Sequence, residues 1–327
     1  MNIKEFIEAM KDPESYPHTT GNIEMKETHI SWVFLTGHFA YKVKKPLKFG
    51  GILDYSNLAN RRLMCEKELV VNRRLNEEMY LETVDIVKGE DGKLHVGYGA
   101  GEVVEHAVKM KQMNQRNLLS EIIKRGEITE TTVKRVAAYM VDFFNSSRVP
   151  QGFATRYAEL TKDHLNATFD TLTDLGKNAE AWRKKFNGYL KNKRELFMER
   201  TANGFVRDLH GDAHSRNFFV DGTKISLFDA IEFNDEFRVQ DIAYEIAALA
   251  MDLDFNGLDK LSKVYADEYL RLSEDANGKK LLPIYMFYWA VVRGEVELEK
   301  SAKTNDRESK LISDKYFKLA EKYFKMF

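Results

Sequence analysis

Apolar and polar residues alternate along the first third of the chain, a pattern typical of β-strands. Within residues 22–45 the alternation forms three short runs, separated by a loop at Glu27–Ser31 and by a turn at Gly37. A period of two places successive side chains on opposite faces of a sheet, so this segment predicts three antiparallel strands. Further strands are expected at residues 83–87, 93–97 and 103–110. The first third therefore predicts an antiparallel sheet.

Helical spacing of apolar residues dominates the rest of the chain. A helix is expected after Ser56, which we expect to cap it because a serine side chain can accept a backbone N–H of the first turn. Other helices are expected at residues 3–10, 117–124 and 131–145, twice within 159–200, directly after residue 241, and through most of 258–327. Together with the sheet, these helices predict the α+β class.

One hairpin interrupts the helical part, and polar residues gather around it. Asp221-Gly222 suits a tight turn with positive backbone angles, and apolar residues flank it on both sides. His210, Asp212 and Asn217 precede the first strand of this hairpin, and Asp229 follows the second. We therefore expect Asn217 and Asp229 near the two open ends of one ribbon.

These residue types suit phosphoryl transfer. The amide oxygen of Asn217 and the carboxylate of Asp229 are ligands that Mg²⁺ accepts together with phosphate oxygens. Asp212, on the loop just before the hairpin, is expected to point at the same space. Because phosphoryl transfer needs a base for the incoming hydroxyl and a metal that neutralises charge, we predict Asp212 as the catalytic base and Asn217 and Asp229 as the metal ligands.

The same residues carry a family resemblance. The run His210-Gly211-Asp212, with Asn217 five residues after the aspartate and Leu227-Phe228-Asp229 further on, resembles the motifs of the aminoglycoside phosphotransferase and choline kinase family. The resemblance is closest to the kinase-like domain of bacterial proteins that fuse it to a P-loop ATPase, although this chain contains no G-x-x-x-x-G-K-[ST] run.

The resemblance implies a bilobal protein-kinase-like fold. A small antiparallel-sheet lobe at residues 1–110 would bind the nucleotide, and a larger helical lobe at residues 111–327 would hold the catalytic loop and the acceptor site. The implied activity is Mg²⁺-dependent transfer of the γ-phosphate of ATP to a hydroxyl of a small acceptor, such as an aminoglycoside, a sugar or an amino alcohol.

The resemblance also assigns residues of the nucleotide site. Lys42 matches the strand lysine that grips the phosphates, with Lys44, on the same face, as the alternative. Glu68 matches the glutamate that pairs with this lysine, while Glu66 lies about 200° around the helix. The loop that replaces a glycine-rich loop contains no glycine, and we expect Ser31 there to face a phosphate.

Four further expectations concern adenine, the catalytic loop and the acceptor site. Met110 and Met113 are expected to sandwich the base at the connector 109–113, although methionines at such spacing also occur in ordinary cores. Asp241 matches the aspartate that braces the catalytic loop; the alternative is a carboxylate at a helix N-terminus. An acidic cluster that begins at Glu232 is expected either to recognise a cationic acceptor or to be a solvated loop. Arg293 is a candidate for reaching the acceptor site.

Three other functions are alternatives to this one. His210, Asp212 and His214 alternate like metal ligands of a hydrolase, but Asn217 and Asp229 then have no role. A regulatory module that binds nucleotide without turnover is the main alternative, although a dead site would be expected to have lost one of the catalytic or metal-binding residues. A protein kinase would need a longer activation segment after Asp229.

Composition narrows the setting. The 327 residues include 50 basic and 51 acidic side chains, so no general field recruits nucleic acid or an anionic membrane. A single cysteine, Cys65, excludes an intramolecular disulfide, and no apolar run has the length of a membrane span. We expect a cytoplasmic protein whose partner is a small hydroxylated acceptor, with a protein partner left open.

Overall fold

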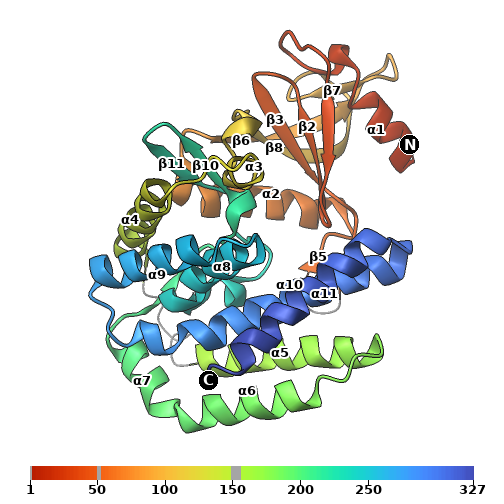
Figure 1. The fold of residues 1–327 in the computed structure, drawn as a ribbon. Coiled ribbons are helices and arrows are strands. Elements are labelled where there is room, and N and C mark those ends of the chain that lie inside the picture. The colour runs from red at the N-terminus through yellow and green to blue at the C-terminus, as the bar shows by residue number, and fades with distance from the viewer. Residues whose placement is uncertain (1, 50–52, 149–155) are drawn as a thin grey trace. The chain divides into compact units, whose positions relative to one another are not determined.

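The chain divides into two compact units. The computed structural model describes residues 2–49, 53–148 and 156–327. A sheet unit comprises Met1–Asn117 and Ser226–Asn234, and a helical unit comprises Leu118–Ile225 and Asp235–Phe327 (Figure 1). The sequence predicted a boundary after residue 110. The structure divides the chain after Asn117 and adds the segment 226–234 to the sheet unit.

The sheet unit is built from the segments that alternate in sequence. Its strands are β1 (Glu24–Glu27), β2 (Ser31–Leu35), β3 (Phe39–Lys44), β4 (Lys48–Phe49), β5 (Leu53–Asp54), β6 (Tyr80–Lys88), β7 (Leu94–Val96) and β8 (Glu102–Lys111). Its helices are α1 (Ile3–Ala9), η1 (Pro13–Ser15), α2 (Leu58–Asn76) and η2 (Gln115–Asn117). Six strands form one antiparallel sheet in the order β1-β2-β3-β8-β6-β7. The antiparallel sheet expected from the alternation is confirmed.

The two faces of this sheet are chemically different. Trp32 and Tyr41 lie on one face, in a core that also includes residues of α1. Because side chains alternate along a strand, Lys42 and Lys44 point to the other face. Helix α2 packs against β6 and β8, and its Glu68 contacts both lysines. The face covered by α2 therefore carries the charged residues.

Helix α2 is capped by a different residue from the one expected. Its N-cap is Asn57, whose side chain accepts the N–H of Asn60. Ser56 donates its hydroxyl to Asp54 at 2.6 Å instead. The expectation that Ser56 caps this helix was wrong. The carboxylate of Asp54 binds the side chain of Ser56, and Asn57, the next residue, has the extended backbone that an N-cap adopts.

The helical unit contains the remaining elements. Its helices are α3 (Leu119–Lys124), α4 (Glu130–Ser146), α5 (Tyr157–Asp174), α6 (Glu180–Asn192), α7 (Arg194–Ala202), η3 (Ser215–Asn217), η4 (Asp235–Phe237), α8 (Ile242–Phe255), α9 (Asp259–Ser273), η5 (Gly278–Lys280), α10 (Leu282–Thr304) and α11 (Arg307–Phe324). The two helices expected within 159–200 are three, because Lys193 leaves helical geometry and separates α6 from α7.

Short strands frame the polar stretch. These are β9 (Val206–Asp208), β10 (Phe218–Asp221), β11 (Lys224–Leu227) and β12 (Val239–Asp241). Strand β9 pairs with β12, and β10 pairs with β11. The predicted hairpin is therefore confirmed, with Gly222 at φ 53° in its turn.

Helix α8 lies in the core of the helical unit. It packs against α9, α10 and α11, and almost all of its residues are buried. The indole N–H of Trp289 on α10 donates to the backbone oxygen of Tyr244 on α8 at 2.9 Å. At Gly294 a Cβ would lie 2.5 Å from the ring of Phe317, so the absence of a side chain lets α11 approach α10 closely. These contacts fix α10, which carries Arg293.

Among the described residues, no helix combines the length and the apolar character that crossing a membrane requires.

Candidate active site

Three predicted residues meet within the sheet unit. The Nζ atom of Lys42 lies 2.7 Å from Glu68 Oε1 and also forms an ion pair with Asp229 Oδ1. Lys44 contacts the other oxygen of Glu68, but its second carboxylate is Glu232 rather than Asp229. The geometry therefore separates the two lysines, since Lys42 is the one that joins Glu68 to Asp229.

Burial and charge act in opposite directions on Lys42. Burial by itself lowers the pKa of this ammonium group, but Asp229, Glu68 and Glu232 outweigh it and raise the pKa well above its usual 10.5. Lys42 is therefore a permanent cation, as a group that binds phosphates must be. Because its partners are carboxylates, Lys42 can replace one of these contacts with a contact to phosphate oxygens.

Asp229 adopts a backbone conformation that is unusual for its residue type. Its φ is 64°, in the left-handed region that favours glycine. Neighbouring residues support it, because its N–H donates to the hydroxyl of Tyr80 at 3.0 Å and the N–H of Ala230 donates to Asn72 Oδ1 at 2.8 Å. Strained residues of this kind cluster at functional sites.

Lys44 belongs to a second buried ion pair that the sequence analysis missed. It contacts Glu232, which also accepts a hydrogen bond from Tyr55 at 2.5 Å. Burial alone raises the pKa of Glu232, but Lys44 and Lys42 bring it below its usual value. The expectation that Glu232 recognises an acceptor or lies in a solvated loop was wrong, because its side chain is buried in the sheet unit.

The other nucleotide candidates are also placed in the sheet unit. Glu66 pairs with Arg62 on the exposed side of α2, away from the lysines. Ser31 is paired with Lys44 across β2 and β3, and its fully buried hydroxyl has no hydrogen-bond partner among the described residues. Met110 is buried in β8. Met113 is partly exposed beyond its end, and the roles of both methionines stay predictions.

The predicted catalytic loop, residues 210–217, lies in the helical unit. Gly211 has φ 89°, a conformation that L side chains rarely adopt. On its two sides, the N–H of Asp212 donates to His210 Nδ1 at 3.1 Å. The amide nitrogen of Asn217 donates to the backbone oxygen of Asp212 at 2.9 Å. The predicted base and the first predicted metal ligand therefore belong to one hydrogen-bonded loop.

Glu245 on α8 supports this loop and was not predicted. Its Oε1 accepts the N–H of Gly211 at 2.6 Å, and its Oε2 is buried with no hydrogen-bond partner among the described residues. Burial is the main cause that raises the pKa of Glu245 to about 8, with a smaller contribution from Asp212. No sequence signal marked this residue, because it lies among the apolar residues of the most buried helix.

Asp241 has a different set of contacts from the one that the resemblance suggested. It caps α8 by accepting the N–H of Ala243, and it forms a buried ion pair with Arg200 of α7. Arg200 also binds Asp275. Of the two predictions for Asp241, the carboxylate at a helix N-terminus agrees with these contacts. The side chain that binds the predicted catalytic loop is Glu245.

Both carboxylate oxygens of Asp212 have partners. Arg293 Nη2 on α10 lies 2.7 Å from Oδ1, and His214 Nε2 lies 3.3 Å from Oδ2. His214 Nδ1 accepts the N–H of Arg216, so the neutral ring carries its proton on Nε2 and donates it towards Asp212. Since His210 Nδ1 likewise accepts a backbone N–H, both histidines have structural hydrogen bonds within the loop.

The two predicted metal ligands belong to different units. Asn217 lies in the helical unit and Asp229 in the sheet unit, at the two ends of the confirmed hairpin. The amide nitrogen of Asn217 is used by the loop, which leaves its amide oxygen for a cation, and the carboxylate of Asp229 is a hard oxygen donor. The donor types therefore fit Mg²⁺, and the shared site stays a prediction.

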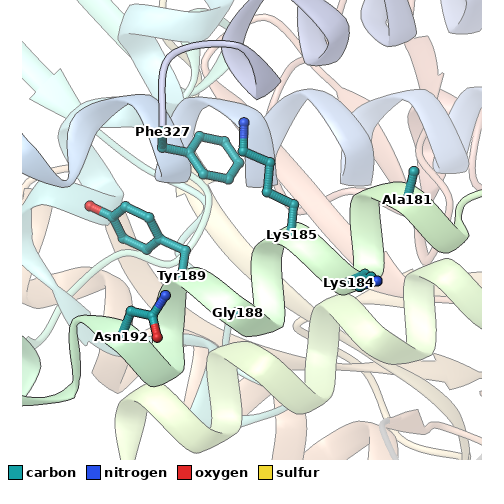
Figure 2. Close-up of a pocket in the computed structure, with 7 residues that line it drawn as sticks. All are labelled: Ala181, Lys184, Lys185, Gly188, Tyr189, Asn192 and Phe327. Atoms are coloured by element: carbon teal, nitrogen blue, oxygen red, sulfur yellow. The ribbon is translucent and has the colours of Figure 1, made fainter.

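A cavity of about 510 Å³ lies elsewhere in the helical unit (Figure 2). It is lined by Ala181, Lys184, Lys185, Gly188, Tyr189, Asn192 and Phe327. The ammonium group of Lys185 lies 4.4 Å from the ring centre of Phe324 and 5.1 Å from that of Phe327. None of the predicted site residues lines this cavity.

Sequence comparison gives relatives without a known function. No protein-family model matches the chain. Two uncharacterized proteins, one from Mycobacterium tuberculosis and one from Mycobacterium bovis, are each 25% identical over 298 residues. The match covers 84% of this chain and 54% of each relative, so the chain spans about half the length of the curated relatives it matches.

Solved structures with a similar fold are small-molecule kinases. A choline/ethanolamine kinase family protein from Mesorhizobium loti matches with a TM-score of 0.57 at 12% identity, over 97% of this chain and 94% of its own. A choline kinase from Cryptosporidium parvum matches with 0.55 at 11% identity, over 99% and 96%. An aminoglycoside phosphotransferase in complex with GDP and kanamycin matches with 0.52 at 13% identity, over 100% of both chains. The chain therefore has the kinase-like fold, a sheet lobe and a helical lobe, as expected.

Proposed function

We propose that this protein is a Mg²⁺-dependent phosphotransferase that moves the γ-phosphate of ATP to a hydroxyl of a small acceptor. The observation that carries the proposal is the joining of Lys42 to both Glu68 and Asp229 in the sheet unit. Lys44, which is likewise held between two carboxylates, does not contact Asp229, so Lys42 is the lysine that joins its predicted partner Glu68 to a predicted metal ligand. The hydrogen-bonded loop of Asp212 and Asn217 supports the same reading.

Each residue has a defined task in this proposal. Lys42, positioned by Glu68, holds the α and β phosphates, while Ser31, Met110 and Met113 contact the nucleotide. Asn217 and Asp229 hold Mg²⁺, which neutralises charge on the phosphates when it is bound. Positioning and charge neutralisation then account for most of the rate enhancement.

Asp212 handles the proton. The acceptor oxygen forms a bond to the γ-phosphorus while the bond from that phosphorus to the bridging oxygen breaks, and ADP leaves with the electrons of the broken bond. The hydroxyl proton passes to a carboxylate oxygen of Asp212. We place this reaction in the cytoplasm, in agreement with a composition that has a single, buried cysteine.

The test compares the wild type with Asp212→Asn, using Mg²⁺ and ATP with a panel of aminoglycosides, sugars, amino alcohols, nucleosides and hydroxy acids. We expect one acceptor class to yield ADP and a phosphorylated product by mass spectrometry, with a loss of about a hundredfold or more in the variant. Asp221→Asn, the same chemical change at the exposed hairpin turn, is the matched control and should leave the rate unchanged.

Nucleotide binding separates the remaining outcomes. If ATP binds but no acceptor is phosphorylated, the protein is a nucleotide-binding regulatory module of kinase-like fold. If the chain does not bind ATP in calorimetry with Mg²⁺, the assignment of the whole site is wrong.

A further inference from the structure

Arg293 is an unusual neighbour for a catalytic base. Its guanidinium group lies 2.7 Å from Asp212 Oδ1, and its side chain is only 15% exposed. Guanidinium offers five N–H donors, yet Asp212 is the one hydrogen-bond partner that it has in the described part of the chain. Most of its donors therefore remain for another oxygen-rich group.

Other charged groups lie around Asp212 and Arg293. Arg216, exposed on η3, adds a second positive charge close to Asp252 and Tyr316. Asp252 is buried and accepts the N–H of Ser215. Glu297, one turn after Arg293 on α10, attracts the guanidinium but forms no hydrogen bond through its buried Oε2. Glu297 is thus a second internal carboxylate, besides Asp212, with which an external ligand of Arg293 would compete.

A hydroxyl that reaches Asp212 must come within a few ångströms of Arg293. A cationic acceptor would there meet a like charge, which is costly in a partly desolvated site. An anionic acceptor would instead meet a planar fork of donors that matches carboxylate and phosphate oxygens. It would also draw Arg293 away from Oδ1, which frees that oxygen for the incoming hydroxyl.

On the basis of the proposed function, we propose that the acceptor is a small hydroxylated anion and that Arg293 binds its negatively charged group. The recognised chemistry is an oxyanion beside a hydroxyl, which a hydroxy acid or a phosphate monoester supplies. Choline and kanamycin, whose names accompany the solved structures of similar fold, are cations and would not be substrates.

The first arm of the test measures binding rather than turnover. Calorimetry on the whole 327-residue chain uses glycerate, glycerol phosphate, neutral glycerol and cationic choline as probes. We expect the two anions to bind at least about tenfold more tightly than glycerol, and about tenfold more tightly still to Asp212→Asn, in which Arg293 loses its internal carboxylate. The ratio between glycerate and glycerol phosphate identifies which oxyanion is preferred.

Variants at Arg293 decide whether this residue is responsible. Arg293→Met should abolish the preference for the anions, and Arg293→Lys, which keeps the charge without the fork, should retain part of it. Circular dichroism and thermal melting show whether each variant is folded. Glu297→Gln removes the second internal carboxylate and should leave anion binding equal or tighter. Equal affinities for glycerol and glycerate, or unchanged anion affinity in folded Arg293→Met, would overturn the inference.

The second arm separates this inference from the proposed function. If no acceptor yields ADP, the phosphotransferase proposal fails, while the calorimetric comparison still decides the role of Arg293. If choline or glycerol is phosphorylated faster than the anions, the phosphotransferase proposal stands and this inference is wrong. If Arg293→Met weakens a non-hydrolysable ATP analogue but not ADP, the arginine serves the γ-phosphate and the inference is again wrong.

Discussion

Two lysines that lie two positions apart on β3 share one carboxylate partner and differ in the second. Lys42 joins Glu68 to Asp229, and Lys44 joins Glu68 to Glu232. If either lysine is removed, Glu68 keeps the other one. Only the loss of Lys44, however, leaves the fully enclosed Glu232 without its lysine. The loss of Lys42 should therefore mainly lower activity, and the loss of Lys44 should mainly lower stability.

The comparison of Lys42→Met with Lys44→Met tests this division. Lys42→Met should lower the phosphotransfer rate by about a hundredfold or more with a modest loss of stability. Lys44→Met should destabilise the protein by about 3–5 kcal/mol, because it leaves a buried carboxylate unpaired. Chemical denaturation and ATP turnover measure the two effects. In the control Lys44→Met/Glu232→Gln, part of the stability should return; equal stability losses in the two single variants would contradict the division.

Glu245 predicts a pH dependence of stability. Its folded pKa of about 8 lies above the usual 4.5, so the folded protein holds this proton more tightly than the unfolded chain does. Its contribution to stability is fully present below the unfolded pKa and is lost as the pH rises through about 8. Glu245→Gln keeps the acceptor for the N–H of Gly211 but cannot ionise, so its melting temperature should fall less between about pH 5 and about pH 8.5.

The matched comparison is necessary because burial also raises the pKa of Glu295, to about 7. Wild type and Glu245→Gln share that residue, so the difference between their two melting curves isolates Glu245. Parallel curves would show that Glu245 does not titrate in this range.

At the scale of elements, α2 presents Glu68 to the lysines, and its first turn depends on one cap. Asn57→Ala should destabilise the protein by about 1 kcal/mol, since the N–H of Asn60 loses its side-chain acceptor. Ser56→Ala is the natural control, because its hydroxyl bonds Asp54 outside the helix and its loss should cost less. Urea denaturation of both variants measures the difference. A larger loss of stability in Ser56→Ala than in Asn57→Ala would indicate that Ser56 is the cap, as the sequence predicted.

At the scale of the whole molecule, the segment 226–234 is assigned to the sheet unit, although the residues before and after it in sequence belong to the helical unit. Hydrogen exchange by mass spectrometry should therefore show this segment protected together with β3 and α2 when Mg²⁺ and a non-hydrolysable ATP analogue bind. An anionic acceptor should instead protect the loop 210–217 and α10. If neither ligand increases the protection of 226–234, the proposed nucleotide site is contradicted.

The sequence predicted features that depend on residues close together in the chain, and it failed where the contacts join distant residues. Alternation predicted the strands, and a short motif selected Asp212, Asn217 and Asp229, because such patterns depend on neighbours in sequence. Glu245 and Glu232 were missed or misread, since each appears as an ordinary acidic residue until its burial and distant partner are known.

The sequence by itself determined which residues the predicted chemistry could use: the loop with the predicted base Asp212, the hairpin after it, and the alternating strands that carry two lysines on one face. Only the tertiary structure decided that Lys42 rather than Lys44 reaches Asp229, and that Arg293 forms an ion pair with Asp212. The physical reason is that periodicity fixes the face on which a side chain lies. Its partner is fixed by packing between segments far apart in the chain, here β3 with α2 and 226–234, and α10 with the catalytic loop.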